Sequence, residues 1–507
     1  MIKIYSIAIT LLGLLATLKA QVLTGDSLAL VAFYQATSGD QWTNNTNWLK
    51  GPVSTWYGVT VQDKRVHQLE LWENGLSGFI PDAIGQLTEL VELSLGISNL
   101  QGPIPSSVGQ LTGLDVLNLR RSGVQGKIPT SLSNCKKLRQ LYLGENRLEG
   151  EVDSSLAGCI KLQFVLLNKN QFSGGFPSFL FNLPDLYAFD ISENLFIGPL
   201  PAQINHLTQV ANMAFSHNQF EGPMPKLDSL VNLEAITFEN NKLTGNLENV
   251  LGYYPKLTYF IANDNAFAGF LSPNHFNPMT VVLLDFFNNQ ITGMGSFTDW
   301  EDKSSFIRLN ITNNKLNFDD LVPNASLPTH KMWWFPQQNV GQDTTIKLQA
   351  GSRHVITSSM KDPDIRYAWS FNGSKISGVT GPEHTILSLN QATAGKYQFI
   401  ATHPKFPDGH LFSATHTVSL QTSSNQDLDP DLYSIQYSGA KNEIQIILQP
   451  LFSNHLIRVF NVNGQLIVNK KTSEEIDTIS LRGRPAGIYF VEVLTEKGRG
   501  VVRILKN

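Results

Sequence analysis

Apolar residues recur along the middle of the chain with a spacing of 24 residues in nearly every step. The motif L-x-L-x-x-N-x-L-x-G-x-I-P recurs from residue 66, with substitutions at some positions. The first copy consists of Leu69, Leu71, Asn74, Leu76, Gly78, Ile80 and Pro81. The L-x-L pair predicts a short strand, because strand side chains point alternately to opposite faces. One copy cannot bury its own apolar face, so the copies must stack into a solenoid.

The asparagine of the motif marks eleven copies. It occurs at Asn74, Asn146, Asn170, Asn194, Asn218, Asn241, Asn265, Asn289 and Asn314, with Ser98 and Ser122 in its place in the second and third copies. An asparagine at a tight bend can satisfy backbone groups that the turn leaves unpaired. Stacked copies should align these amides in a structural ladder, which we expect to be weaker at the two serines.

This motif resembles the plant-type leucine-rich repeat of receptor ectodomains and secreted inhibitor proteins, over about residues 66–320. The resemblance implies a solenoid of short parallel strands with irregular or 3-10 return arms, which we place at 66–322. Residues 21–65 are similar to the N-terminal cap of that family. This cap contains an amphipathic segment around Asp26–Thr37, then Trp42, Trp48 and the run W-Y-G-V from Trp56. The family usually has paired cysteines in the cap, and this chain has none there.

The chain contains only two cysteines, Cys135 and Cys159, which stand 24 residues apart at the same place in consecutive copies. They should therefore stack directly on each other. We expect two free thiols filling the core of the return arm, because unpaired cysteine behaves as a small buried hydrophobe. A disulfide is the alternative, since the spacing and an oxidising compartment would permit one.

A different pattern begins after Phe318, where the 24-residue period ends. Strand-like segments at short spacing over 335–422 include Y-A-W-S from Tyr367 and G-K-Y-Q-F from Gly395. They resemble the tryptophan strand and the tyrosine corner of an immunoglobulin-like β-sandwich. Phe399 stands where the second cysteine of that fold is expected. Because a fold alone implies no function, we expect a spacer rather than a ligand-binding module.

Two polar segments separate these regions. Residues 323–345 contain several prolines and predict a connector. Residues 423–431 predict a linker, in which Asp427, Asp429 and Asp431 alternate as acidic residues do in calcium loops. The glycine and the distal glutamate of an EF-hand are absent, so we expect a solvated linker rather than a metal site.

The last segment, 432–507, predicts a second β-sandwich. Strands are expected at Ile444–Leu448, Leu456–Phe460, Ile479–Leu481, Ile488–Leu494 and Val501–Leu505, with a hairpin turn at Asn463-Gly464. The segment resembles the C-terminal sorting domain of the type IX secretion system of Bacteroidota. Gly464, Gly487, Tyr489 and Lys506 fall where that pattern places them. The resemblance implies translocation across the outer membrane by that secretion machinery, followed by surface attachment or release.

The N-terminus and the charge distribution point to the same location. Lys3 followed by apolar residues from Ile4 to Leu18 predicts a signal peptide over 1–20, too short for a membrane anchor. We therefore expect a protein that is secreted or held on the outer cell surface, without a transmembrane anchor. Residues 21–330 carry 18 Lys and Arg against 28 Asp and Glu. Such an acidic solenoid would repel phosphate backbones, which makes nucleic acid an unsuitable partner.

No pattern of catalytic residues is present in the chain. The motifs of zinc peptidases, serine hydrolases, P-loops and dinucleotide-binding folds are missing. Asp408 and His410 are expected in a loop as a solvated pair, and Asp190 and Asp285 are four copies apart, too far for a carboxylate pair. We therefore expect no enzyme activity, no cofactor and no metal.

The predicted function is recognition of a protein, peptide or glycan through the concave sheet, in which apolar residues should cluster at two places. The candidate ligand-binding residues are Arg120, Arg121, Tyr142, Phe164 and Leu166, then Tyr259, Ile261, Leu283 and Phe287. Exposed apolar patches on neighbouring strands often mark interfaces. For the second cluster, packing against the following domain is an equal alternative. For the whole chain, a structural or adhesive protein with the solenoid as a spacer is the alternative function.

Overall fold

The computed structural model describes residues 22–300, 302, 306–421, 433–448, 454–495 and 498–506. The chain divides into two compact units. The first comprises Met1–Gln342, Ser359–Ala368 and Phe399–Ala414, and the second comprises Asp343–Ser358, Trp369–Gln398 and Thr415–Asn507. The expected signal peptide and the aspartates of the expected linker lie outside the described residues.

The N-terminal cap closes the first coil with an aromatic cluster. Helix α2 (Thr24–Ala36) precedes strand β1 (Val59–Gln62), which pairs antiparallel with β2 (Arg65–Glu70). The Trp48 ring lies 4.8 Å from the rings of both Trp42 and Trp56, measured between centroids, and 5.5 Å from Tyr34. These buried rings occupy the cap in which the plant-type family usually has paired cysteines.

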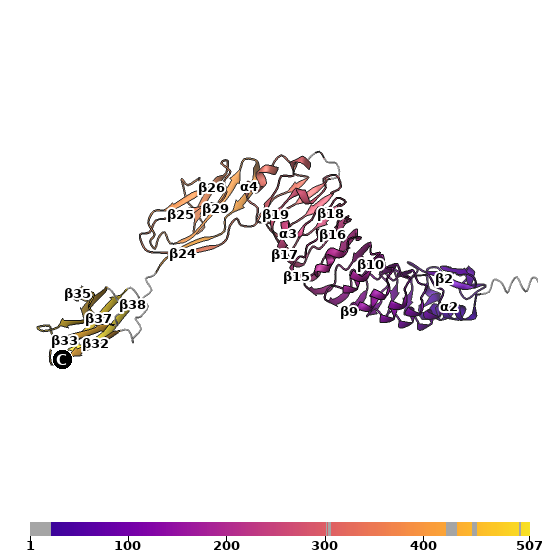
Figure 1. Cartoon of the computed structure of the whole chain (residues 1–507), viewed down its shortest axis with the longest axis horizontal. Helices are drawn as coiled ribbons and strands as arrows, with labels where there is room; N and C mark the ends of the chain where they lie inside the picture. Colours follow the sequence, from indigo (N-terminus) through magenta and orange to yellow (C-terminus); the bar gives the residue numbers. More distant parts are fainter. Residues whose placement is uncertain are drawn as a thin grey trace, which may run out of the picture. The chain divides into compact units, whose positions relative to one another are not determined.

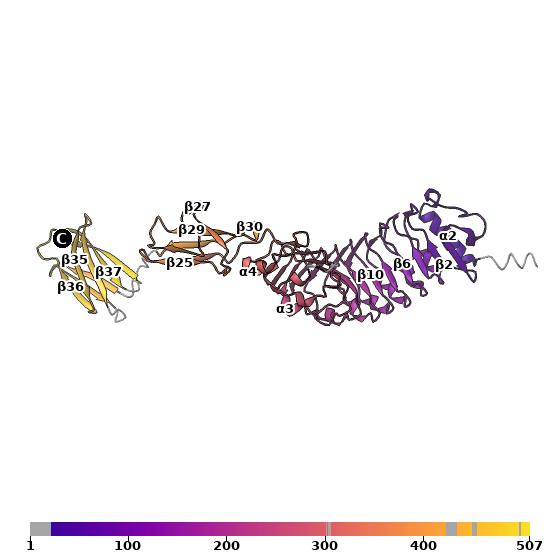
Figure 2. The ribbon, with the colours of Figure 1, turned by 90° about the horizontal axis from the view of Figure 1, so that it is seen from above.

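Eleven parallel strands follow one another in sequence order along one face of the solenoid. Figures 1 and 2 show how these strands run along the solenoid. They are β2, β4 (Glu92–Ser94), β6 (Val116–Asn118), β8 (Gln140–Tyr142), β10 (Phe164–Leu166), β12 (Ala188–Asp190), β14 (Asn212–Ala214), β16 (Ala235–Thr237), β18 (Tyr259–Ile261), β20 (Leu283–Asp285) and β22 (Arg308–Asn310). With β1 and β23 (Met332–Trp333) at its ends, this is a 13-stranded sheet. The predicted strand of each copy is thus confirmed, and its leucines, such as Leu69 and Leu71, are fully buried.

The opposite side of each coil adds short parallel strands that the sequence pattern did not predict. An eight-stranded path consists of β7 (Gln125–Gly126), β9 (Arg147–Glu151), β11 (Gln171–Gly174), β13 (Leu195–Gly198), β15 (Gln219–Pro223), β17 (Lys242–Asn246), β19 (Ala266–Leu271) and β21 (Gln290–Met294); β3 (Ser77–Gly78) pairs with β5 (Asn99–Leu100). The side chains of Phe172, Phe196 and Phe220 stack in successive coils beneath these strands, with centroids 6.4 and 6.1 Å apart.

Short helices connect the two sides of the coils. They are η3 (Asp82–Gln86), η4 (Ser106–Gln110), η5 (Thr130–Asn134), η6 (Ser154–Gly158), η7 (Ser178–Asn182), η8 (Ala202–His206), α3 (Leu247–Val250), η9 (Pro273–His275) and η10 (Thr298–Trp300). The expected 3-10 return arm is therefore present in most coils. Cys135 and Cys159 follow η5 and η6, are fully buried and are free thiols. Their Sγ atoms donate to the carbonyls of Val108 and Leu132 in the preceding coils.

The repeated asparagines lie at the bend after each strand of the 13-stranded sheet. Asn194 donates from Nδ2 to the carbonyl oxygens of Leu167, Ile191 and Ser192 at 3.0–3.2 Å. Its Oδ1 accepts the backbone N–H of Phe172 at 3.0 Å. Where serine replaces asparagine, as at Ser122, the hydroxyl donates chiefly to Leu119 O in its own bend at 2.6 Å, with Asn146 Oδ1 of the next coil at 3.3 Å. One amide therefore joins two successive coils, whereas a serine chiefly holds its own bend.

The solenoid continues beyond Asn314, so the connector expected over 323–345 is corrected. Strand β23 pairs parallel with β22, and Gln337 stands 23 residues after Asn314. Gln337 donates from Nε2 to Ile311 O at 2.9 Å and accepts Asn314 N–H at 3.1 Å. This glutamine takes the place of the motif asparagine. Residues up to about Val340 thus form a further, degenerate coil.

The degenerate coil is joined to part of the following sandwich within the first compact unit. Helix α4 (Phe318–Leu321) and η11 (Val322–Asn324) begin the contact. The Phe318 ring stacks on Phe406, with centroids 5.9 Å apart. The Asp319 carboxylate accepts the backbone N–H groups of Lys361 and Asp362 at 2.9–3.0 Å. This carboxylate therefore fixes the Ser359–Ala368 segment against the end of the solenoid.

The region after the solenoid has the features expected of an immunoglobulin-like sandwich. Its strands are β24 (Thr344–Leu348), β25 (His354–Thr357), β26 (Arg366–Phe371), β27 (Ser374–Lys375), β28 (Glu383–Ile386), β29 (Gly395–His403), β30 (Phe406–Phe412) and β31 (His416–Leu420). Trp369 is fully buried, and the Tyr397 hydroxyl donates to Thr393 O at 2.7 Å. The expectation of a loop at Asp408 and His410 is wrong, because both residues lie in β30, where they are exposed.

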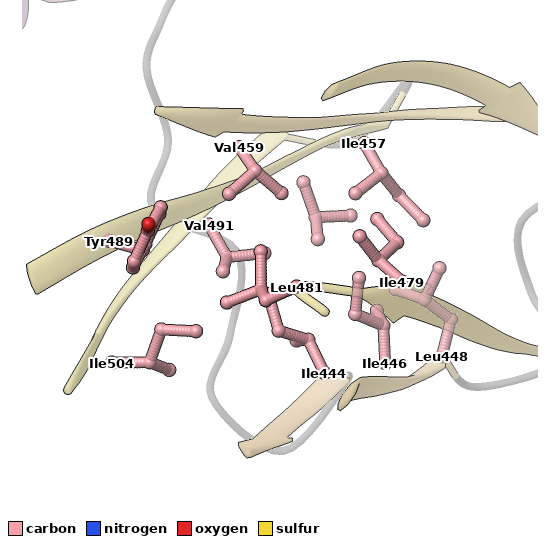
Figure 3. Packing of buried hydrophobic residues seen from close by; sticks show 11 residues of the cluster. Ile444, Ile446, Leu448, Ile457, Val459, Ile479, Leu481, Tyr489, Val491 and Ile504 are labelled. Carbon is pink, nitrogen blue, oxygen red and sulfur yellow. The ribbon is translucent and has the colours of Figure 1, made fainter. Parts of the chain in front are cut away.

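The C-terminal region is a sandwich of two antiparallel sheets. One contains β32 (Tyr433–Ser438), β33 (Glu443–Leu448) and β36 (Ile476–Ser480); the other contains β35 (Leu466–Thr472), β34 (His455–Asn461), β37 (Gly487–Thr495) and β38 (Gly498–Lys506). Eleven buried residues from both sheets form the core that Figure 3 shows: Ile444, Ile446, Leu448, Ile457, Val459, Ile479, Leu481, Tyr489, Val491, Val493 and Ile504. The predicted hairpin is present at Gly464 (φ +76°), between β34 and β35. Strands β32 and β35 were not among the expected ones.

Candidate ligand-binding face of the solenoid

The 13-stranded sheet presents side chains in columns, because every coil repeats the same backbone path. In the first coil the outward positions are Gln68, Glu70 and Trp72, which flank the buried leucines. The interior strands are hydrogen-bonded to neighbours on both edges. Their backbone groups are therefore already paired, so a ligand on this face would be recognised by side chains. The residues that occupy these columns therefore determine which ligands the face can bind.

The first predicted cluster, Arg120, Arg121, Tyr142, Phe164 and Leu166, lies on or directly after three adjacent strands, and we call it the proximal patch. Tyr142 and Leu166 are register partners in β8 and β10. The Tyr142 hydroxyl donates to Gln140 Oε1 at 2.9 Å, and partial burial raises its pKa. Tyr142, Phe164 and Leu166 are half-buried, so part of each apolar surface is open to solvent.

Charge in the proximal patch is partly paired. Arg120 donates from Nε to Glu145 Oε1 at 2.9 Å, and this hydrogen bond lowers the pKa of the Glu145 carboxyl. Arg121 is exposed and has a φ of +52°. The same position has positive φ in every coil, from Glu73 to Asn313. The backbone therefore holds Arg121 at the rim of the patch rather than in the sheet.

A shallow cavity of about 520 Å³ adjoins the proximal patch. It is lined by Gln163, Phe164, Pro184, Asp185, Leu186, Tyr187 and Gln209. The rings of Phe164 and Tyr187 are 5.6 Å apart between centroids, and Tyr187 is 41% exposed. The Tyr187 hydroxyl donates to Glu234 Oε2 at 3.3 Å, and the charge of Glu234 raises its pKa. Tyr187 thus extends the patch to a fourth strand.

Tyr187 was not among the predicted residues, because the prediction covered only the positions that flank the buried leucines. Tyr187 stands one residue before the first of those positions, directly ahead of β12. The equivalent residues include Asp115 and Arg139, which form a bidentate pair with both distances 2.5 Å. This fourth column therefore also faces outward. An aromatic residue in this column was the feature of the sequence that could have identified Tyr187 as part of the patch.

The second predicted cluster, Tyr259, Ile261, Leu283 and Phe287, lies on β18 and β20 or shortly after β20, and we call it the distal patch. Tyr259 and Leu283 are register partners, and Tyr259 is 43% exposed. Three strands, β12, β14 and β16, separate it from the proximal patch. The nine predicted residues therefore form two surfaces rather than one.

Two residues that the sequence analysis did not select enlarge the distal patch. Trp333 continues the column of Ile261, Asp285 and Asn310, and it is 45% exposed. The guanidinium carbon of Arg308 lies 4.1 Å from the centroid of the Trp333 ring. Trp333 was missed because the prolines around it predicted a connector instead of a coil.

The two aspartates of the sheet face are isolated from each other. Burial raises the pKa of both Asp190 and Asp285. Asp190 accepts hydrogen bonds from the backbone N–H and the hydroxyl of Ser192, and Asp285 accepts Phe287 N–H. Four strand steps separate them, about 19 Å at the usual strand spacing. They therefore do not form a carboxylate pair for acid–base chemistry.

A cluster of Asp362, Asp364 and His403 has the donor types of a metal site, with ligand atoms within 4.8 Å of one another. His403 is buried, and its Nδ1 accepts Lys405 N–H at 3.1 Å. In the neutral ring the proton then lies on Nε2, which is 3.2 Å from Asp362 Oδ1 and donates to it. Because neither nitrogen keeps a free lone pair, these residues fit a structural hydrogen-bond network rather than a metal.

Comparison with known families identifies the C-terminal sandwich. Residues 439–507 match the secretion system C-terminal sorting domain. Gly464, Gly487, Tyr489 and Lys506 lie in this segment, and Lys506 is buried with its Nζ donating to Leu481 O at 3.0 Å. The sorting domain indicates a protein that is secreted or placed on the outer surface. Among the described residues no helix is long and apolar enough to cross a membrane.

Solved structures show the fold of the solenoid. The PEPR1–AtPEP1 structure is 25% identical, with a TM-score of 0.53, and the match covers 64% of this chain and 49% of that one. The LRR ectodomain of the plant membrane receptor kinase GASSHO1/SCHENGEN3 from Arabidopsis thaliana, in complex with CASPARIAN STRIP INTEGRITY FACTOR 2, is 23% identical, with a TM-score of 0.50 and coverage of 64% and 45%.

A plant ice-binding protein is 24% identical, with a TM-score of 0.49 and coverage of 55% of this chain and 89% of that one. The chain spans about half the length of the PEPR1 and GASSHO1 chains that it matches. No curated protein matches the sequence. The solenoid thus has the leucine-rich-repeat fold of plant receptor ectodomains.

Proposed function

We propose that this chain, a leucine-rich-repeat solenoid carrying a secretion-system sorting domain, is a binding protein of the outer surface or the medium. In this proposal it leaves the cell by a type IX route and binds a protein, peptide or glycan on the face of its 13-stranded sheet. The binding is non-catalytic, in keeping with the isolation of Asp190 from Asp285 on that face. The GASSHO1/SCHENGEN3 ectodomain, which shares the fold, was solved in complex with CASPARIAN STRIP INTEGRITY FACTOR 2.

The proximal patch is the observation that carries the proposal. Half-buried aromatic and aliphatic side chains from β8 and β10 meet the cavity beside Tyr187. Arg120 and Arg121 border them. Tyrosine and arginine next to a partly enclosed apolar surface are the residue types that dominate binding energies at interfaces. A purely structural spacer has no need for such a partly exposed aromatic and aliphatic patch on its sheet face.

The test uses the full mature chain, immobilised and probed with a printed glycan array and a random-sequence peptide library. Tyr142→Ala combined with Phe164→Ala should weaken binding of the strongest probe about tenfold or more, because both rings would contact it. The thermal midpoint should change little, since both side chains are half-buried at the surface. The matched control is Tyr253→Ala, which removes a tyrosine that is 53% exposed and lies outside the sheet strands.

Two outcomes would count against the proposal. A double variant that binds its probe as tightly as the unchanged chain would move the site away from the proximal patch. If no probe binds, and deletion of the protein abolishes cell adhesion, the structural or adhesive alternative would replace ligand recognition.

A further inference from the structure

We infer that the distal patch is a carbohydrate-binding platform for a neutral polysaccharide, with Tyr259 and Trp333 as its stacking surfaces. This inference rests on the proposed function, because it assigns a ligand class to the second surface of the same sheet face.

The two rings are exposed and fixed at different ends of the patch. Tyr259 and Trp333 are 43% and 45% exposed, and they lie on β18 and β23, which are three strand steps apart. At the usual strand spacing these two strands are about 14 Å apart. An extended oligosaccharide can span such a distance, and the C–H faces of its sugar rings pack well on flat aromatic rings.

The Trp333 ring is preorganised. Its strand pairs with β22, and the Arg308 guanidinium lies 4.1 Å from the ring centroid on the same face of the sheet. A cation above the ring restrains the rotation of the side chain without closing it off from solvent. Stacking of a ligand on this ring therefore costs little conformational entropy, because the Trp333 side chain is already ordered.

Polar, planar groups lie between and beside the two rings. Asp285 and Asn310 occupy the positions between Ile261 and Trp333 in the same column. Asp285 is half-buried, whereas Asn310 is only 7% exposed, so Asp285 is the more accessible of the two. At the rim of the same coils, Asn288 donates to Asp264 Oδ1 at 2.7 Å and Asn313 donates to Asn288 Oδ1 at 2.6 Å. Aligned amides and carboxylates supply the paired donors and acceptors that sugar hydroxyls require.

The charge of the patch favours a neutral ligand. Burial raises the pKa of the Asp285 carboxyl, and the hydrogen bond from Phe287 N–H and the positive charge of the neighbouring Arg308 act in the opposite direction. A phosphorylated or sulfated polymer would meet Asp264 and Asp285 without an excess of cations. A protein partner would favour a continuous apolar surface, whereas here polar residues interrupt the space between the rings.

The experiment titrates the full mature chain with three neutral polysaccharides, namely laminarin, mixed-linkage β-glucan and yeast mannan. Dextran sulfate serves as the charged comparator, and calorimetry is the measurement. At least one neutral polymer should bind. Trp333→Ala and Tyr259→Ala should each weaken that binding about tenfold, whereas Trp333→Phe, which keeps a ring, should stay within about threefold. Tyr253→Ala should bind as the unchanged chain does.

Several results would overturn the inference. They are the absence of binding to all three neutral polymers, binding to dextran sulfate alone, and neutral binding that Trp333→Ala leaves intact. Loss of binding in Trp333→Phe as well as Trp333→Ala would indicate a structural role for Trp333. The Tyr142 and Phe164 double variant separates the two proposals. If a peptide or protein probe depends on the proximal patch while no neutral glycan binds, only the carbohydrate assignment fails.

Discussion

At the residue scale, the motif asparagine connects successive bends through its side-chain hydrogen bonds. Asn194 makes four hydrogen bonds, three of them to carbonyl oxygens and one from Phe172 N–H, and it is 6% exposed. Asn194→Ala would leave those backbone groups without partners in the interior. We expect it to lower the free energy of unfolding by about 1–3 kcal/mol, the usual cost of an unsatisfied buried group. Urea unfolding followed by circular dichroism measures the change.

The matched control for this prediction is Asn134→Ala. Asn134 is exposed at the end of η5 in a different coil. Its substitution should change the free energy of unfolding by less than about 0.5 kcal/mol. Equal unfolding midpoints for Asn194→Ala and the unchanged chain would show that the ladder contributes nothing to stability.

Asp190 gives a pH-dependent prediction at the same scale. Burial raises its folded-state pKa, with the Ser192 hydrogen bonds and Lys169 acting in the opposite direction. An acid whose folded pKa is raised stabilises the fold most below its unfolded pKa of about 3.9, and this contribution is lost as pH rises through the folded value. Asp190→Asn should therefore have a higher thermal midpoint than the unchanged chain at pH 7.

The difference in thermal midpoint between Asp190→Asn and the unchanged chain should shrink as pH falls towards 4, because the protonated acid and the amide then resemble each other. Scanning calorimetry across this range measures both midpoints. Asp185→Asn is the control, since Asp185 is exposed in the same coil. An advantage that is equal at pH 4 and pH 7 would exclude titration of Asp190 as its cause.

At the element scale, the N-terminal cap shows how the first coil is closed without cysteines. Trp48 is 3% exposed and contacts the rings of Trp42, Trp56 and Tyr34. Trp48→Ala would leave a cavity at the centre of this cluster and should cost about 3–5 kcal/mol. Thermal unfolding measures this loss of stability. Tyr57→Ala, which removes an exposed ring of the same cap, should lower the stability much less. If both substitutions lower the stability equally, Trp48 is not central to the packing of the cap.

The elements that could be predicted from the sequence are those that the 24-residue period specifies. An alternating L-x-L pair and an asparagine at fixed offsets determine which residues face inward, so all eleven strands were expected. Strand β23 was not expected, because prolines interrupt the 24-residue pattern and Gln337 replaces the motif asparagine one residue early. The glutamine side chain is one methylene longer, which lets it reach Ile311 O from that position.

The candidate site could be predicted only in part, for a similar reason. Tyr142 and Phe164 were found because column positions follow from the repeat. Tyr187 and Trp333 contribute to the patches through rings whose orientation depends on neighbours such as Glu234 and Arg308. Those neighbours come from other coils, and the columns alone do not show which of them will meet.

At the scale of the whole molecule, export and recognition belong to different parts of the chain. The sorting domain has its own core, formed by residues of β33, β34, β36, β37 and β38. The solenoid carries the acidic excess of 28 Asp and Glu against 18 Lys and Arg over residues 21–330, whereas residues 430–507 carry 7 against 10. Because the core of the sorting domain is formed by its own residues, removing that domain should leave the solenoid folded.

Deletion of residues 432–507 tests this division. In a bacterium with a type IX secretion system, the shortened protein should accumulate in the periplasm, because the segment that matches the sorting domain is gone. Cell fractionation with surface proteolysis locates it. Tyr142→Ala in the full-length chain is the control, which should reach the surface normally because its change lies in the solenoid. If the shortened protein is displayed or released as efficiently as the full-length one, the C-terminal sandwich is not the export signal, and the sequence match would reflect its fold alone.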